Sequence, residues 1–154
     1  MSTRSNIARL NSDGSVDVIY CHWDGYLTGV GMELVLHYDT KKEMNDLIDL
    51  GDISSLRDTI EETKKETYKD EDSAPQHFES LDAYAKHLQE TESWVEYVYV
   101  AKEIEEPERW MPDVEWFVAH NHNDGKLQFT KVPNPFVVLA TLDKNMKDAP
   151  LAML

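Results

Sequence analysis

The residues best equipped for chemistry lie together in the segment 20–26, which reads YCHWDGY and combines a thiol, an imidazole, a carboxylate and aromatic rings. His22 and Asp24 are two positions apart, so on an extended backbone both side chains would project from one face and could share a proton or a metal ion. The pair Asp24-Gly25 is also typical of an Asx-turn, in which the Asp24 carboxylate caps the following amides. His22 would then pack beside Trp23. We favour the turn, because a metal ion usually needs three or four ligands.

The aromatic side chains of this segment have a second interpretation. Amphipathic aromatic rings are typical of the energetic hot spots of protein interfaces, and they also line small pockets. The segment therefore predicts a binding patch, whether for a partner protein or for a small ligand. The candidate binding residues are Tyr20, His22, Trp23, Asp24 and Tyr26.

A second set of metal-type residues follows at His120, His122 and Asp124. On one continuous strand this spacing would align two imidazoles and a carboxylate, as in a metal triad. Asp124-Gly125 predicts a chain reversal instead, which would use the Asp124 carboxylate in the turn. We predict no metal site and no cofactor. The weak candidates for metal ligands are His22, His120 and His122, which could converge only if the two chain reversals were adjacent.

Nucleophilic catalysis has little support in the sequence. Cys21 is the only cysteine, so no disulfide can form within the chain, and no catalytic-cysteine signature surrounds it. A lone cysteine at a strand end is typical of a small buried residue. The sequence contains no nucleophile elbow, phosphate-binding glycine loop or dinucleotide fingerprint. It also shows no secretion signal and no apolar run that could cross a bilayer, so we predict a cytoplasmic, non-catalytic protein.

The charge balance is strongly acidic. Thirty aspartates and glutamates oppose 15 lysines and arginines, for a formal net charge of -15. This charge disfavours direct binding to nucleic acid or membrane surfaces and favours a partner protein with a basic surface. The alternative interpretation is that the acidic residues serve only to keep the protein soluble. The candidate acidic surface, which could mimic DNA, comprises Glu61, Glu62, Glu66, Asp70, Glu71, Asp72, Glu103, Glu105, Glu106 and Glu108. Interspersed lysines also fit an ordinary solvated helix.

Local patterns predict the elements that position these residues. Asp13-Gly14 predicts a hairpin of 3–10 and 15–21, and Asp124-Gly125 predicts another of 114–121 and 126–132. Thr40 begins a capping box, with Gly51 suited to the end of that helix. The remaining predictions are a short helix after the glycines at 25, 29 and 31, a weak helix around 56–63, a helix capped by Ser80, a strand at 94–100, and a strand or helix at 136–142.

Together these elements predict a single α+β domain over residues 1–154. Its antiparallel sheet would have roughly five strands, with helices packed mainly on one face. Residues 61–76 are almost entirely charged or polar, and we interpret them as an exposed acidic excursion. The sequence leaves the oligomeric state open.

Four segments carry a resemblance to a known family: 3–8 (TRSNIA), 19–26 (IYCHWDGY), 29–31 (GVG) and 47–56 (LIDLGDISSL). They resemble a family of small, uncharacterised proteins of bacteriophages, prophages and bacteria. The resemblance covers the first third of the chain and implies a context rather than a chemistry. It implies a phage or prophage accessory protein that acts in the host cytoplasm by binding a host protein, with inhibition of a defence or nucleic-acid enzyme as one form. The alternative is a small-ligand-binding protein or a metal-dependent hydrolase with a His/Asp pocket.

Overall fold

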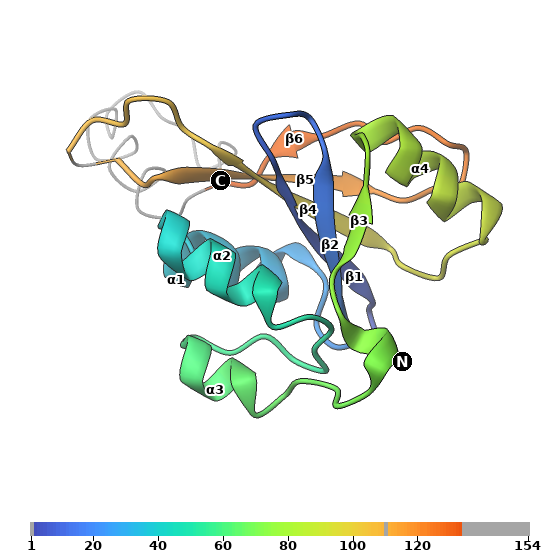
Figure 1. Cartoon of the computed structure of the whole chain (residues 1–154), viewed down its shortest axis with the longest axis horizontal. Coiled ribbons are helices and arrows are strands. Elements are labelled where there is room, and N and C mark those ends of the chain that lie inside the picture. The colour runs from blue at the N-terminus through green and yellow to red at the C-terminus, as the bar shows by residue number, and fades with distance from the viewer. Residues whose placement is uncertain (1, 110, 134–154) are drawn as a thin grey trace, which may run out of the picture.

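The computed structural model describes residues 2–109 and 111–133, which form a six-stranded sheet flanked by helices (Figure 1). The strands are β1 (Ser5–Leu10), β2 (Val16–Cys21), β3 (Gln76–Phe78), β4 (Tyr97–Glu103), β5 (Val114–His120) and β6 (Thr130–Lys131). The α-helices are α1 (Met32–His37), α2 (Lys41–Asp49), α3 (Ile60–Lys64) and α4 (Leu81–Glu90). A π-helical turn, η1 (Leu27–Gly31), precedes α1, and a 3₁₀ turn, η2 (Glu71–Ser73), precedes β3. The predicted α+β class is confirmed.

The sheet is mixed, which corrects the prediction of an antiparallel sheet of roughly five strands. Its order is β3-β2-β1-β4-β5-β6. β1 and β4 are parallel, with Ser5 opposite Tyr97, while the other neighbouring pairs are antiparallel. Parallel neighbours need a long crossover, and the chain between β1 and β4 supplies one that contains all four α-helices named above. The edge strand β3 has only three residues and carries no strong strand pattern.

Several local predictions are confirmed by the caps and turns. The first hairpin forms with Gly14 at a φ of 89°. The Thr40 side chain accepts the Glu43 amide at the start of α2, and Gly51 follows that helix at a φ of 82°. The Ser80 side chain likewise accepts the Ala83 amide at the start of α4. Left-handed glycines and N-cap side chains are local devices, so they can be recognised from sequence.

Other element boundaries differ from the predictions. The weak helix at 56–63 begins only at Ile60, because the Thr59 side chain caps the Glu62 amide there. The strand predicted at 94–100 starts at Tyr97 and continues to Glu103. In the second hairpin, only Thr130 and Lys131 of the predicted returning strand pair with β5. Segment 136–142 lies outside the described residues.

The predicted acidic excursion at 61–76 contains short elements. It includes most of α3, all of η2 and the first residue of β3. Thr63 and Ser73 are buried, whereas most of its acidic side chains are exposed. Thr63 accepts the Arg57 amide at 3.0 Å and contacts the Tyr38 hydroxyl at 2.9 Å, so the segment is tied to the core.

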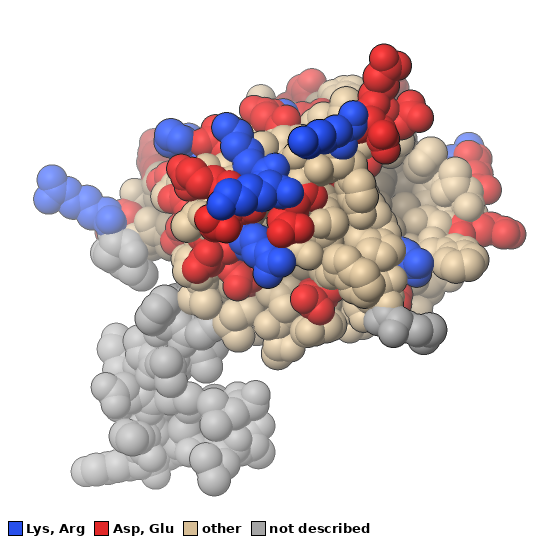
Figure 2. All heavy atoms as spheres, turned by 90° about the horizontal axis from the view of Figure 1, so that it is seen from below, with Lys and Arg blue, Asp and Glu red and all other residues tan. Residues whose placement is uncertain are grey.

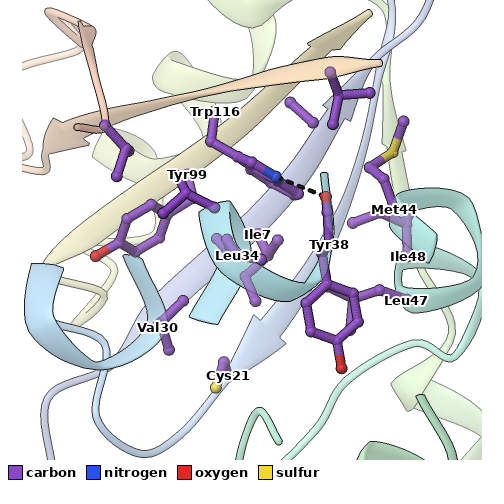
Figure 3. Packing of buried hydrophobic residues seen from close by; sticks show 14 of the residues in the cluster. Ile7, Cys21, Val30, Leu34, Tyr38, Met44, Leu47, Ile48, Tyr99 and Trp116 are labelled. Atoms are coloured by element: carbon purple, nitrogen blue, oxygen red, sulfur yellow. Dashed lines mark hydrogen bonds between the residues drawn. The ribbon is translucent and has the colours of Figure 1, made fainter. Parts of the chain in front are cut away.

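Hydrophobic residues cover both faces of the sheet. The larger cluster lies under α1 and α2, with Ile60 of α3 packed against it, and the smaller one lies under α4, as expected for helices mainly on one face. Trp116 lies at the centre of the larger cluster and donates its indole N–H to the Tyr38 carbonyl at 2.9 Å (Figure 3). Within the described residues, no helix is long and apolar enough to cross a membrane.

Candidate functional site

The segment 20–26 lies where β2 ends and the chain turns toward α1. The His22 and Trp23 amides donate to the Ile53 and Ser54 carbonyls at 3.2 and 2.9 Å, so residues 53–54 continue the hydrogen bonding beside the strand end. Asp24 adopts a left-handed conformation with a φ of 58°. Its carbonyl accepts the Val30 amide at 2.8 Å, which closes the turn onto η1.

Two contacts fix this turn on the core. A Cβ atom at Gly25 would lie 2.8 Å from Ser5 Cβ, so only glycine allows this close approach to β1. The Gly25 carbonyl also accepts the buried Tyr99 hydroxyl at 2.7 Å. Burial, the main cause, raises the pKa of Tyr99, so this hydroxyl stays protonated and continues to donate. These contacts with β1 and β4 therefore hold the turn at residue 25 in place against the sheet.

On this fixed turn, three large apolar side chains remain in solvent. Trp23 is 46% exposed, and Tyr26 and Leu27 are each 41% exposed. We call these three residues the Trp23 patch. Large apolar groups held rigidly in water cost little entropy to dock against a partner. Leu27 escaped the sequence prediction because its position on a π-helical turn has no sequence signature.

The polar members of segment 20–26 bond within the segment. The Tyr20 hydroxyl and His22 Nδ1 are 2.7 Å apart, and the imidazole contacts the edge of Trp23 with ring centroids 4.6 Å apart. The predicted packing of His22 beside Trp23 is confirmed. The Asp24 carboxylate accepts the Tyr26 hydroxyl at 3.1 Å, and this hydrogen bond raises the pKa of Tyr26. The Asx-turn prediction is wrong, because the left-handed backbone of Asp24 makes the turn instead.

The cavity beside the Trp23 patch measures 180 Å³, which is small for a cofactor because ligand pockets typically measure roughly 300 to 1,000 Å³. Its lining includes Trp23, the carboxyl-bearing residues Asp24 and Glu33, and Arg57. Glu33 Oε2 is buried and has no hydrogen-bond partner within the described residues; His37 Nε2 approaches it to 3.7 Å. Arg57 is already engaged by Glu66 at 3.3 Å. The Trp23 ring and the two carboxyl-bearing residues give this cavity a lining that suits a cationic group.

The two later histidines lie at the end of β5. Their rings stack with centroids 6.1 Å apart, and His120 also packs on Tyr97 at 4.6 Å. Both line a cavity of 280 Å³ together with Asp124. The Asp124 carboxylate accepts the Lys126 amide at 2.9 Å, which confirms its predicted use in the turn.

His22 does not join these histidines. Cys21, Ser5, Tyr97 and His120 are successive cross-strand partners, so the ends of β2 and β5 are three strand spacings apart, about 14 Å. Across residues 2–109 and 111–133, no group of three or more His, Cys, Asp or Glu residues is arranged to hold a metal ion.

Cys21 is fully buried under the same turn. Burial raises the pKa of its thiol to about 12, and its Sγ contacts the Trp23 carbonyl at 3.5 Å. A thiol with that pKa is essentially never a thiolate at neutral pH, so it is a poor nucleophile. The predicted role of Cys21 as a small buried residue is confirmed.

The candidate acidic residues fall into two separate groups. Residues 61–72 lie near the Cys21 end of the sheet, because Thr67 pairs with Ile53 and Ile53 with Cys21. Residues 103–108 follow the far end of β4, about 20 Å along that strand. Several members are neutralised by neighbours: Lys65 binds Glu62, Arg57 binds Glu66, and Lys41 lies 3.7 Å from Glu103. Positive and negative side chains intermingle on the face drawn in Figure 2.

Comparisons with protein-family models, with curated proteins and with solved structures found no match. The fold and the site define the chain as an α+β protein built on a mixed six-stranded sheet, with a hydrogen-bonded turn at one end that exposes apolar side chains.

Proposed function

We propose that this chain is a non-catalytic binding protein that docks a partner protein through the Trp23 patch. The observation that carries the proposal is the exposure of Trp23, Tyr26 and Leu27 on a backbone turn that the sheet holds in place. Aromatic side chains of this kind dominate interface energetics, since they bury much apolar area at a low entropic cost.

The partner's chemistry follows from the cavity beside the patch. A lysine or arginine side chain would fit between the ring of Trp23 and the carboxyl-bearing residues Asp24 and Glu33, gaining a cation–π contact and a charge-assisted contact. The net charge of -15 favours the encounter with a basic surface and repels phosphate backbones. The proposed partner is therefore a protein that presents a basic side chain within an apolar rim.

The biological setting belongs to the same proposal. The resemblance of segments 3–8, 19–26, 29–31 and 47–56 to small phage and prophage proteins suggests an accessory protein acting on a host component in the cytoplasm. Inhibition of a defence or nucleic-acid enzyme fits a basic target. The acidic residues act as a general attractive field in this account, because they fall into two groups and several of them are paired with Lys41, Arg57 or Lys65.

The alternative of a metal-dependent hydrolase gains no support from the geometry. His22 and Asp24 lie about three strand spacings from His120 and His122, and the Asp124 carboxylate is used in a turn.

The proposal is tested by capture from a bacterial lysate with the tagged wild-type protein and three variants. Trp23→Ala and Glu33→Gln should each lose the captured protein, because they remove the ring and the charge that receive the basic side chain. Trp94→Ala, which removes a more exposed tryptophan outside the patch, should retain it. Equal capture by all four proteins, or loss only with Trp94→Ala, would refute docking through the Trp23 patch.

A further inference from the structure

A separate cavity lies on the α4 side of the sheet. It has a volume of 230 Å³ between the start of β1, the end of β2 and the last turn of α4. That volume equals about eight water molecules in the liquid, so it suits a ligand the size of an amino acid. The residues used below are Arg4, Tyr20, Tyr84, His87, Ser93 and Trp94.

Arg4 is the cation of this cavity, and the fold holds it without neutralising it. Its carbonyl accepts the Glu96 amide at 2.9 Å, which anchors the backbone where β1 and β4 begin. Its guanidinium lies over the Trp94 ring, 5.4 Å from the centroid. Among the described residues, no carboxylate oxygen comes within 4 Å of that guanidinium.

Two hydroxyl groups of the lining have donors to spare. The fully buried Tyr84 hydroxyl accepts the Asn6 side-chain amide at 2.7 Å, and Ser93 Oγ accepts the Val95 amide at 3.3 Å. An amide nitrogen can only donate, so each hydroxyl has used a lone pair and kept its own proton. Neither proton has an acceptor among the described residues. Burial raises the pKa of Tyr84, so its hydroxyl remains a donor near neutral pH.

The lining also lacks the residues that would repel an anion. It contains no aspartate or glutamate, although the chain has 30 of them. Four other cavities of the described chain each have at least one carboxyl-bearing residue in their lining, and the one that includes Glu96 borders the other side of Arg4 and Trp94. Burial raises the pKa of the neighbouring Tyr20 hydroxyl, and the positive charge of Arg4 opposes that rise.

We propose that this cavity, the Arg4 pocket, binds a small organic anion through a carboxylate or phosphate group. The guanidinium of Arg4 would bind the oxyanion, the hydroxyls of Tyr84 and Ser93 would donate to it, and Trp94 would cover it from the solvent side. Planar guanidinium groups bind both kinds of oxyanion in a bidentate manner, so the shared chemistry is an oxygen anion with at least two acceptor atoms.

The test is a titration of the full chain followed by ¹H–¹⁵N NMR at the Arg4 Nε and Trp94 Nε1 resonances. The probes are inorganic phosphate and glutarate, with sodium chloride at matched ionic strength as the control. We expect saturable shifts of both resonances with phosphate, with glutarate, or with both, and the two arms identify the preferred oxyanion. Chloride should give only small, non-saturating shifts.

Variants make the test specific. Arg4→Met should weaken binding by about tenfold or more, since a charge-assisted hydrogen-bond pair is lost. Arg4→Lys should fall between it and wild type, and Arg57→Met, at the other cavity, should match wild type. A dispersed spectrum of Arg4→Met confirms folding. Non-saturating shifts with both probes, or equal affinity in Arg4→Met, would overturn the Arg4 pocket. Because it does not involve the Trp23 patch, Arg4→Met should leave partner capture unchanged.

Discussion

The two arginines near the ends of β1 are used in opposite ways. Arg9, in the last half of the strand, binds Asp17 of β2 at 2.9 Å and Asp49 of α2 at 2.9 Å. Arg4, just before the strand, lies over an exposed tryptophan, and no salt bridge forms to it within the described residues. The Arg9 end thus uses its charges to join strands and helix. The Arg4 end leaves charges and aromatic rings available for binding.

The same contrast holds for apolar side chains. The exposed large hydrophobic residues of the described chain all lie near the end of the sheet where β2 and β5 end and β1 and β4 begin; they are Trp23, Tyr26, Leu27, Tyr68 and Trp94. A protein that needed these rings for stability would bury them, as it buries Trp116. Their concentration at one end is the basis of the proposal that this end serves recognition.

The largest effect expected for a side chain outside the hydrophobic core separates the two arginines by stability. Arg9→Met should lower the free energy of unfolding by about 2 kcal/mol, because it leaves the half-buried Asp17 without its guanidinium partner. Arg4→Met should cost less than about 1 kcal/mol, the worth of an exposed cation–π contact. Urea unfolding of both variants measures the difference. Equal losses would break the comparison between the two ends.

Asp17, the partner of Arg9, should also make the stability of the protein depend on pH. Burial opposes ionisation of Asp17, but hydrogen bonds from His77, Arg9 and Asn11 outweigh it and hold the pKa of Asp17 below its usual value. A lowered folded-state pKa stabilises the protein above the unfolded pKa of about 4, and this contribution is lost as the pH falls through the folded pKa.

Asp17→Asn is the variant that checks this dependence. It should lower the free energy of unfolding by about 1 kcal/mol at neutral pH, and its difference from wild type should shrink below pH about 4. Asp46→Asn, on an exposed pair with Lys42, is the matched control and should change little at any pH. An Asp17→Asn effect that stays constant down to pH about 2 would contradict the assignment.

Smaller effects are expected from the exposed rings. Trp94→Ala, at a side chain that is 77% exposed, should change the free energy of unfolding by about 0.5 kcal/mol or less. Trp116→Ala, at a buried ring that donates to the Tyr38 carbonyl, should cost about 3 to 5 kcal/mol and serves as the reference. Thermal and urea unfolding compare the two. A large loss of unfolding free energy with Trp94→Ala would show that this ring stabilises the fold.

The smallest effect concerns Cys21. Its thiol is buried and has a pKa of about 12, so a thiol reagent at neutral pH should label it only when the chain unfolds. Labelling kinetics with and without denaturant measure this directly. Rapid labelling of the folded protein would show that the turn over Cys21 opens readily, against the rigid turn on which the Trp23 patch depends.

Sequence patterns predicted the features that a few neighbouring residues decide. The Asp13-Gly14 hairpin and the helices capped by Thr40 and Ser80 depend on side chains within four residues of each other. The parallel pairing of β1 with β4 joins distant segments, so its direction has no local signal. The short strand β3 forms because β2 offers it a hydrogen-bonding edge.

The candidate sites also differ in whether their residues are close together in the sequence. Trp23 and Tyr26 could be identified because one short segment contains them. The Arg4 pocket combines side chains from positions 4, 84 and 93, which only the folded chain brings together. Whether His22 could meet His120 was open for the same reason: it depends on strand order, which the sequence does not state, and β1 and β4 lie between them.

The measurement that tests the central claim most directly combines binding and stability on one preparation of Trp23→Ala. Partner capture and urea unfolding are measured side by side with wild type. We predict that the captured protein is lost while the free energy of unfolding changes by less than about 1 kcal/mol, because Trp23 is half in solvent. Capture at the wild-type level would contradict the claim, and so would a loss of capture that is matched by unfolding of the variant.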